Sequence, residues 1–260
     1  MKIFTSTDSY KKLAFMTKEK LIGLAENLDI EIVDDVESSD IVFSIGGDGT
    51  FLKTARIANG KPILGINAGT LGYLTQISPD DIENALDDLT RGKYNIENRM
   101  MIEGKIIKST GDIVDIPESL NEIAISKNML GVVRFDAIVN GKLINSYTAD
   151  GILVCTPTGS TAYNLSCGGP IADPTAEILT LTPIAPHTVI NRSIVLSKDS
   201  VVEIRLTEVR QNTSSYVLYD GKPIEVNSGD LIQIKKSDKI TRIVKLEDRS
   251  FIDAIRENIN

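Results

Sequence analysis

The chain has 260 residues, of which 42% are hydrophobic and 25% charged, and its formal net charge is −8. This composition is typical of a globular protein, and the length allows one large or two modest domains. An acidic chain without a long basic run is not expected to bind nucleic acid. No apolar run of membrane-spanning length and no leader pattern occurs, so we expect a cytoplasmic protein that does not enter a membrane.

The chain contains two cysteines, Cys155 and Cys167, and one histidine. Two cysteines are too few for a disulfide framework, so we expect reduced thiols in or near a core. The same scarcity of soft ligands argues against a zinc site.

The first part of the chain predicts strands that alternate with helices. Strands are expected at 2–6, 30–33, 41–45 and 62–66. Asp8 or Ser9 is expected to cap the first helix. The apolar positions of that helix recur at near-helical spacing at Leu13, Met16, Leu21, Leu24 and Leu28. The alternation predicts a parallel sheet, whose ligands bind beyond the carboxyl ends of the strands.

A glycine-rich stretch, Ser-Ile-Gly-Gly-Asp-Gly-Thr at 44–50, joins an apolar strand to a helix expected over 51–58. Its three glycines, Gly46, Gly47 and Gly49, are expected to adopt backbone conformations closed to other residues and to let a phosphate approach the helix N-terminus. Asp48 would repel a phosphate, so it is expected to face a hydroxyl or a metal. A glycine turn capped by Asp48 is the alternative.

Two further features complete this half. The loop Asn-Ala-Gly-Thr-Leu-Gly-Tyr at 67–73 leaves the next strand at the same sheet edge, which favours a ligand site there. Ser78, Pro79, Asp80 and Asp81 then open a helix that ends at Gly92.

Beyond Gly92, short strand-like runs separated by turn residues predict a mostly antiparallel β region. Asn140-Gly141 and Asp220-Gly221 are hairpin signals. We therefore predict an N-terminal Rossmann-like α/β domain over 1–95 and a β-rich, sandwich-like domain over 96–244. A C-terminal helix within 245–260 is expected to return to the first domain.

Three stretches of the β-rich half offer ligand-binding groups. Asn121-Glu122 opens a strand and presents the donors and acceptors that an adenine edge or ribose hydroxyls need, although such a pair is often only a turn. Asp150-Gly151 precedes a buried strand, although a lone Asp-Gly pair is usually only a turn. The hydroxyl-rich segment 156–166 then enters a helix, which suits phosphate or sugar recognition as well as simple helix capping.

Together these motifs resemble the NAD kinase family over most of the chain. The resemblance is carried by Gly-Gly-Asp-Gly-Thr at 46–50, Asn-Ala-Gly-Thr-Leu-Gly-Tyr at 67–73, Asn-Glu at 121–122, Asp-Gly-Ile-Leu-Val-Cys-Thr-Pro-Thr-Gly-Ser-Thr-Ala-Tyr at 150–163 and Pro-His-Thr at 186–188. It implies phosphorylation of the adenosine-ribose 2′-hydroxyl of NAD by ATP to give NADP. It also implies a homodimer or homotetramer.

By this resemblance Asp48 is the catalytic residue, and Asp150 reaches the nicotinamide end from a neighbouring subunit. The implied NAD contacts are Asp48, Gly49, Asn121, Glu122, Asp150, Thr161, Ala162, Tyr163, Asn164, Leu165, Ser166 and Ala185. The implied phosphate and ATP contacts are Gly46, Gly47, Gly49, Thr50 and Lys53, with a solvated helix lysine as the alternative for Lys53. Thr148 stands where some relatives carry a basic residue, and His187 is expected to be structural.

The chemistry requires a base near the hydroxyl and cations on the phosphates. We expect Mg²⁺ to arrive with ATP and to use few protein ligands, and no protein metal site is predicted. Inorganic polyphosphate is left open as an alternative donor. Two other functions also remain open: a diacylglycerol- or sphingosine-type lipid kinase with the same glycine motif, and a non-catalytic NAD-binding sensor.

Overall fold

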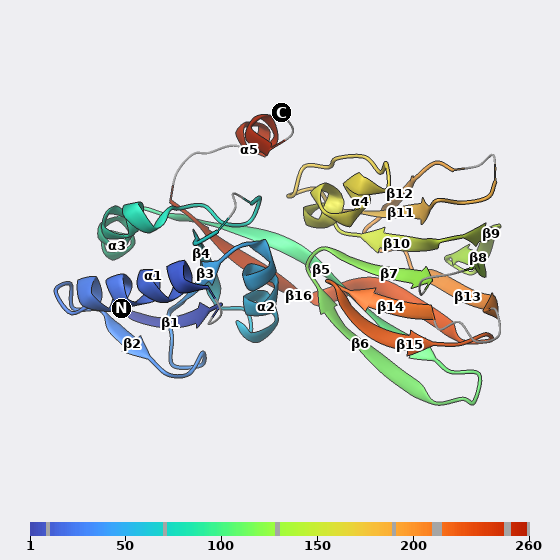
Figure 1. Cartoon of the computed structure of the whole chain (residues 1–260), viewed down its shortest axis with the longest axis horizontal. Helices are drawn as coiled ribbons and strands as arrows, with labels where there is room; N and C mark the ends of the chain where they lie inside the picture. The colour runs from blue at the N-terminus through green and yellow to red at the C-terminus, as the bar shows by residue number, and fades with distance from the viewer. Residues whose placement is uncertain are drawn as a thin grey trace. The chain divides into compact units, whose positions relative to one another are not determined.

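The computed structural model describes residues 1–8, 11–69, 72–127, 131–188, 191–209, 215–246 and 251–258. The chain forms two compact units, Met1–Arg99 with Ile240–Asn260, and Met100–Lys239 (Figure 1). Two long strands, β5 (Asn95–Ile107) and β16 (Leu231–Lys245), contribute residues to both units.

The first unit is built on a parallel sheet in the order β2-β1-β3-β4. Its strands are β1 (Lys2–Thr7), β2 (Glu31–Val33), β3 (Ile41–Gly46) and β4 (Pro62–Asn67). The end of β16 adds to β4, also in parallel. Every residue of β3 is buried, as expected for a central strand covered on both faces. The predicted parallel sheet is confirmed.

Helix α1 (Lys12–Ala25) buries a different face from the one that its large apolar residues suggest. The buried positions are Ala14, Thr17, Leu21 and Ala25, whereas Leu13 and Met16 are exposed. Small residues allow the helix to lie close to β1 and β3, and the Thr17 hydroxyl donates to the Leu13 carbonyl at 2.7 Å. The predicted cap is also wrong for Asp8, because Lys11 is the N-cap residue and forms no side-chain cap. Ser9 lies outside the described residues.

Two further helices of this unit are α2 (Asp48–Ile57) and α3 (Ile82–Thr90), of which α3 follows a short 3₁₀ turn, Pro79–Asp81. Ser78 caps this turn in a capping box with Asp81, as the sequence predicts. Gly92 ends the segment with a φ of 69°. Helix α2 begins three residues earlier than predicted, so Asp48 is its first residue.

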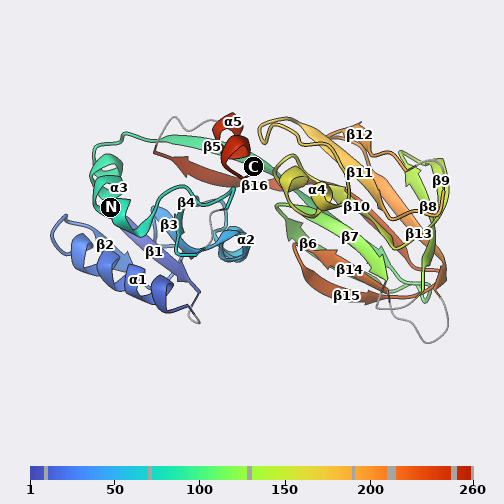
Figure 2. The same cartoon turned by 45° about the horizontal axis from the view of Figure 1, so that its top comes forward.

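The second unit contains two antiparallel sheets (Figure 2). One contains β5 and β6 (Ile113–Ser119) beside β16, followed by β13 (Val202–Val209), β8 (Val133–Val139) and β9 (Lys142–Ala149). The other has the order β12-β11-β10-β7-β14-β15, and its strands are β12 (Ile194–Ser197), β11 (Ile178–Ile184), β10 (Gly151–Cys155), β7 (Glu122–Lys127), β14 (Ser215–Tyr219) and β15 (Lys222–Val226). Strand-like runs were not predicted for β6, β11 and β12, whereas β15 follows the predicted hairpin turn at Asp220-Gly221.

Both predicted hairpin turns are present. Asn140 and Gly141 have φ values of 50° and 75°, and Asp220 and Gly221 have values of 43° and 79°. Two successive positive φ values define the turn whose twist matches a right-handed pair of strands.

One apolar core joins residues of the two sheets of the second unit, as in a β-sandwich. From β7 and β10 the inward residues are Ile123, Ile125, Ile152 and Val154. Because side chains alternate along a strand, Glu122 and Cys155 point to the opposite, outer face of their sheet. That outer face carries the candidate site of this unit.

The predicted C-terminal helix is present as α5 (Phe251–Asn258), and it groups with the first unit. Its packing against that unit stays a prediction. No helix of the described ranges is long and apolar enough to cross a bilayer.

Candidate functional site

In the first unit, the glycine-rich stretch forms the junction between β3 and α2. Thr50 and Phe51 donate their N–H groups to the carbonyl of Gly47 at 2.9 and 3.1 Å, which starts the helix. The N–H groups of Asp48 and Gly49 therefore precede the helical ladder, at the positive end of the helix. This geometry suits contact with an anion.

The predicted reason for the glycines is partly wrong. None of Gly46, Gly47 and Gly49 has a positive φ, so other residues could adopt the same backbone. Gly46 is required because a Cβ there would lie 2.2 Å from the Thr50 hydroxyl. At Gly47 and Gly49 a Cβ would meet nothing within 4 Å, so the absence of side chains leaves open space at the start of the helix.

Asp48 is held by backbone N–H groups from the loop that follows β4. Its Oδ2 accepts a hydrogen bond from Tyr73 at 2.9 Å, and its Oδ1 accepts one from Leu74 at 3.1 Å. A Cβ on Gly72 would lie 2.2 Å from Oδ1, so only glycine fits there. Burial, together with the Asp48 charge, raises the pKa of Tyr73. The two predicted glycine loops therefore come together around Asp48.

The loop after β4 also approaches residues that the sequence did not single out. Ala68 donates to the Gly46 carbonyl at 3.1 Å, which ties this loop to the glycine stretch. Beside it, the Lys11 ammonium lies 3.5 Å from the place of a Cβ on Gly69. A lysine just before a helix carries no sequence signal for this position, because the contact depends on the sheet order. Thr70 and Leu71 of the motif lie outside the described residues.

Lys53 and Thr50 differ in exposure. Lys53 is exposed on α2, and it forms no ion pair within the described ranges. Thr50 is buried beside Gly46. One turn further, the buried Thr54 hydroxyl lies 2.9 Å from the Ser6 hydroxyl and 3.1 Å from that of Ser44, so polar contacts attach α2 to the sheet.

In the second unit, one carboxylate organises the Asn121-Glu122 motif. The Asp220 carboxylate accepts hydrogen bonds from three successive backbone N–H groups, those of Leu120, Asn121 and Glu122, at 3.0, 2.9 and 3.3 Å. In return, Asp220 N–H donates to the Glu122 carbonyl at 3.1 Å. Sequence reasoning identified Asp220 only as a turn residue, because its partners lie about a hundred positions away.

Asn121 is fixed on its other side by the segment 156–166. Its carbonyl accepts the Thr156 N–H at 2.9 Å, and a Cβ on Gly159 would lie 2.2 Å from that oxygen. The side-chain amide of Asn121, by contrast, has no hydrogen-bond partner in the described part of the chain. A fixed backbone with an uncommitted amide suits recognition of a ligand.

Glu122 is only 9% exposed, and its Oε2 is buried without a hydrogen-bond partner among the described residues. Burial, and to a lesser extent Asp220, raises its pKa to about 8. Directly opposite on β10 is Cys155, and burial, with Glu122, raises the pKa of that thiol to about 12. Both cysteines are free, as predicted.

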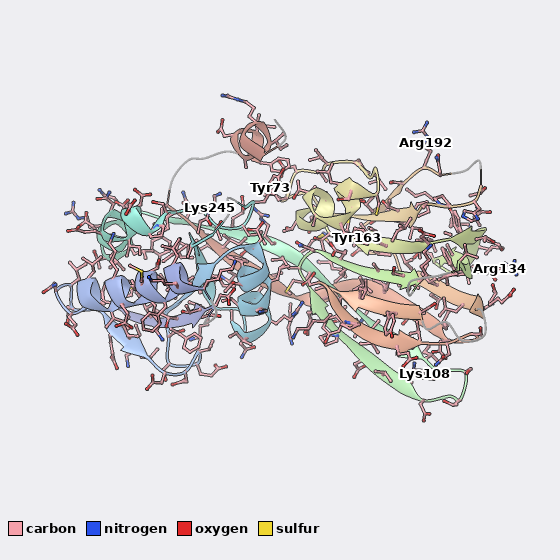
Figure 3. All side chains as sticks on the ribbon, viewed as in Figure 1. Tyr73, Lys108, Arg134, Tyr163, Arg192 and Lys245 are labelled. Carbon is pink, nitrogen blue, oxygen red and sulfur yellow. The ribbon has the colours of Figure 1, made fainter. Side chains whose placement is uncertain are left out.

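Tyr163 is the first residue of the short helix α4 (Tyr163–Ser166), which follows a 3₁₀ turn, Thr158–Thr161, and its side chain is labelled in Figure 3. Burial is the main cause that raises the pKa of Tyr163, and Cys167, Asp150 and Glu122 add to it. These four side chains therefore share one electrostatic environment. Burial and Glu122 likewise raise the pKa of Cys167, against a hydrogen bond with Tyr163 that lowers it.

Asp150 forms an ion pair with Lys127, with its Oδ1 2.6 Å from the Lys127 Nζ. Its backbone N–H donates to the Ile184 carbonyl at 3.0 Å, and its carbonyl accepts the Lys127 N–H. Lys127 was not predicted. Its position at the end of β7 reaches Asp150 only because β7 and β10 pair.

The rest of segment 156–166 divides into internal and open positions. Asn164 is fully buried, where its amide donates to the carbonyls of Ser160 and Pro170 and accepts from Thr182 at 2.7 Å. Its side chain is thus used inside the fold, and a ligand contact by Asn164 stays a prediction. The more open positions are Thr161, Ala162, Leu165 and Ser166.

The chain after β11 returns towards Asp150. Ala185 is exposed and has a φ of 44°, a conformation that costs a non-glycine residue about 1–2 kcal/mol. His187 donates its backbone N–H to the Thr148 carbonyl at 2.8 Å, in line with a structural role. Thr148 pairs across the strands with Arg134 on β8.

No three His, Cys, Asp or Glu side chains of the described residues lie close enough together to hold a metal ion. Asp48 offers only its remaining lone pairs, because both of its oxygens already accept backbone N–H groups. These lone pairs suit a divalent cation that arrives already bound to a nucleotide and needs few ligands from the protein.

The first unit has an aspartate-bearing glycine loop beyond the carboxyl ends of its parallel strands, which is where α/β sheets bind ligands, and this arrangement suits a nucleotide-binding enzyme. The ATP-NAD kinase N-terminal domain matches residues 5–94, and the ATP-NAD kinase C-terminal domain matches residues 120–246. The chain therefore belongs to the ATP-NAD kinase family.

Named relatives agree with this assignment. An NAD kinase from Caldanaerobacter subterraneus subsp. tengcongensis is 40% identical over 225 residues, covering 85% of this chain and 78% of the relative. One from Thermoanaerobacter sp. (strain X514) is 37% identical over 230 residues, covering 87% and 80%. The chain thus has NAD kinase activity, which decides between the alternatives that the sequence left open.

Two solved structures share the fold. The yeast NADH kinase complexed with NADH superimposes with a TM-score of 0.88 at 21% identity, covering 100% of this chain and 87% of that one. An NAD kinase from Archaeoglobus fulgidus in complex with ATP gives a TM-score of 0.79 at 26% identity, covering 98% of both chains.

The raised pKa of Glu122 predicts a pH-dependent cost to stability. Between pH 4.5 and about 8 the folded chain keeps this proton, whereas the unfolded chain has lost it. Unfolding therefore releases a proton, and the free energy of unfolding falls by about 1.4 kcal/mol per pH unit from this group. Glu122→Gln should remove this slope, so its stability advantage over the parent should grow from pH 5 to pH 8. Urea denaturation at both pH values measures it.

The exposed Glu208 provides the control. Glu208→Gln should follow the pH profile of the parent. Parallel profiles for Glu122→Gln and the parent would show that Glu122 is ionised in the folded chain.

Proposed function

We propose that the chain transfers the terminal phosphoryl group of ATP to the adenosine-ribose 2′-hydroxyl of NAD, with Asp48 as the group that accepts the hydroxyl proton. The observation that carries this proposal is the position of Asp48. Its carboxylate is fixed by Tyr73 and Leu74 at the start of a helix whose first residues have open space around them.

Two bound N–H groups do not prevent Asp48 from acting as a base. Each carboxylate oxygen has two lone pairs, and only one of each is used. The two bonds hold the carboxylate in one orientation, which favours a productive approach of the hydroxyl. Because phosphoryl transfer is loose, the base mainly orients the hydroxyl and takes its proton late.

The triphosphate is proposed to lie over the residues at the start of α2, namely Gly46, Gly47, Gly49 and Thr50. The N–H groups of Asp48 and Gly49 support this assignment, since they precede the helical ladder. Two lysines, Lys11 and Lys53, are candidates for phosphate contacts. Mg²⁺ is proposed to enter with ATP and to neutralise phosphate charge.

NAD is proposed to bind the outer face of the six-stranded sheet. Asn121 and Glu122 would hold the adenosine half, and Thr161, Ala162, Tyr163, Leu165, Ser166 and Ala185 would line the dinucleotide. The uncommitted Asn121 amide and the unpartnered Glu122 Oε2 support this assignment. The carboxylates of Asp150 and Asp220 disfavour a pyrophosphate beside them, so this surface suits hydroxyls or a base.

A homodimer or homotetramer is proposed, in which Asp150 serves the site of a neighbouring subunit. Strand β9 ends its sheet, and two of its apolar side chains, Leu143 and Ile144, are exposed. Exposed apolar residues on an edge strand favour association with another chain.

Asp48→Asn should lower kcat by roughly 10²–10⁴-fold, because the amide cannot accept the proton. Affinity for NAD, measured by calorimetry, should change little. Asp35→Asn is a matched control, since Asp35 is an exposed acid of the same unit bonded to Ser38. A kcat for Asp48→Asn within about threefold of the parent would remove Asp48 from this role.

Asn121→Ala should weaken NAD binding by roughly 5- to 150-fold, since a lost polar contact typically costs about 1–3 kcal/mol. The KM for ATP should move far less. Steady-state kinetics with each nucleotide varied separately measures both, with Asn145→Ala on β9 as the control. An effect confined to ATP would mean that the two nucleotides are assigned the wrong way round.

Asp48→Asn and Asp150→Ala, each inactive alone, should regain activity when mixed if Asp150 acts across subunits. A mixed pair then contains one site with both aspartates. Exchange is verified by native mass spectrometry of isotope-labelled chains. Demonstrated exchange without regained activity would place Asp150 in the site of its own chain.

A further inference from the structure

The Glu122 side chain is buried in the second unit without the hydrogen bonds that a carboxylate requires. It is more than nine-tenths buried, and Oε2 has no partner in the described part of the chain. A buried, unpaired carboxylate is so costly that such a group either finds a partner or remains protonated. Most native buried polar atoms are paired, so this one requires an explanation.

Burial and the charge of Asp220 both disfavour ionisation of Glu122. Asp220 approaches from the turn between β14 and β15, Cys155 lies opposite on β10, and Cys167 and Tyr163 approach from α4. None of these is a cation, and no Lys or Arg of the described ranges stabilises the Glu122 anion. The nearby Lys127 is already paired with Asp150.

The Asp220 carboxylate cannot move away from Glu122 without losing its own hydrogen bonds. Its carboxylate is held by three N–H groups of residues 120–122, which fix its place beside Glu122. The same three bonds fix the backbone from which the Glu122 side chain projects. The acidic environment is therefore built into the fold.

We infer that Glu122 binds the adenosine half of NAD as a neutral carboxylic acid, with its hydroxyl as the hydrogen-bond donor and its carbonyl oxygen as an acceptor. This inference rests on the proposed function. A neutral acid offers a donor and an acceptor side by side, which matches vicinal ribose hydroxyls or a donor–acceptor edge of a base. The ionised form offers acceptors only.

A protonation requirement has a consequence for NAD binding. Below the pKa of about 8, Glu122 already carries its proton, and binding takes up none. Above this pKa, Glu122 must take up one proton from solvent for each NAD that binds. The Kd should then rise by about tenfold per pH unit, with an uptake that approaches one proton per NAD.

Isothermal titration calorimetry of the full chain with NAD tests this at about pH 6.5 and about pH 9, each in two buffers of different ionisation enthalpy. The parent should take up no proton at the lower pH and close to one at the higher pH. Glu122→Gln, which keeps an amide donor and a carbonyl, should bind NAD with the same Kd at both pH values and take up none. Glu208→Gln should behave as the parent.

A parent protein whose Kd is independent of pH, or which binds more tightly at pH 9 without proton uptake, would overturn the inference. This measurement needs no variant, so a poorly folded Glu122→Gln would not affect it. An assay of NADP formation at neutral pH separates a failure of this inference from a failure of the proposed function. Activity without proton linkage would refute the protonation of Glu122 alone, whereas failure to bind NAD or to form NADP would refute the proposed function and this inference with it.

Discussion

Backbone N–H groups hold two carboxylates around which the candidate sites of the two units are organised. Asp48 is bound by Tyr73 and Leu74, and Asp220 by residues 120–122. Hydrogen bonds from backbone to carboxylate are charge-assisted, and their geometry is set by the fold.

The two carboxylates, Asp48 and Asp220, have different chemical roles. Asp48 keeps free lone pairs at the start of α2, as a proton acceptor requires. Asp220 is fixed beside Glu122, and its charge adds to burial in raising the pKa of that residue. Burial of Glu122 thus lowers the free energy of unfolding, which is typical of a residue retained for binding and not for packing.

Alternation along the strands separates stability from function in the second unit. On β7 and β10 the inward residues Ile123 and Val154 join the sandwich core, while Glu122 and Cys155 lie on the outer face. The site is therefore built on rigid strands whose other face is anchored by the core. The segment 156–166 is attached in turn through Thr156 and Gly159, which contact Asn121.

Local patterns in the sequence determined the parallel α/β half, both hairpin turns and the motifs of the candidate site. These depend on periodicity, turn chemistry and glycine spacing, which act over a few residues. The wrong or missing predictions concern features that depend on tertiary contacts and not on such local patterns. The buried face of α1 depends on how closely the helix approaches the sheet, so Ala14 and Thr17 are buried in place of Leu13 and Met16. Strand β11 was missed because its polar Thr180 and Thr182 are buried only by its neighbours.

The sequence alone thus indicated the family and most of the residues proposed to bind nucleotides. Only the tertiary structure decided how those residues are held: Asp48 by the loop after β4, Asn121 and Glu122 by Asp220, and Asp150 by Lys127. It also decided that Glu122 is buried beside Asp220, and that Gly46 and Gly72 are needed for space and not for backbone freedom. Hydrogen bonds and burial of this kind join residues far apart in the chain, so no local pattern encodes them.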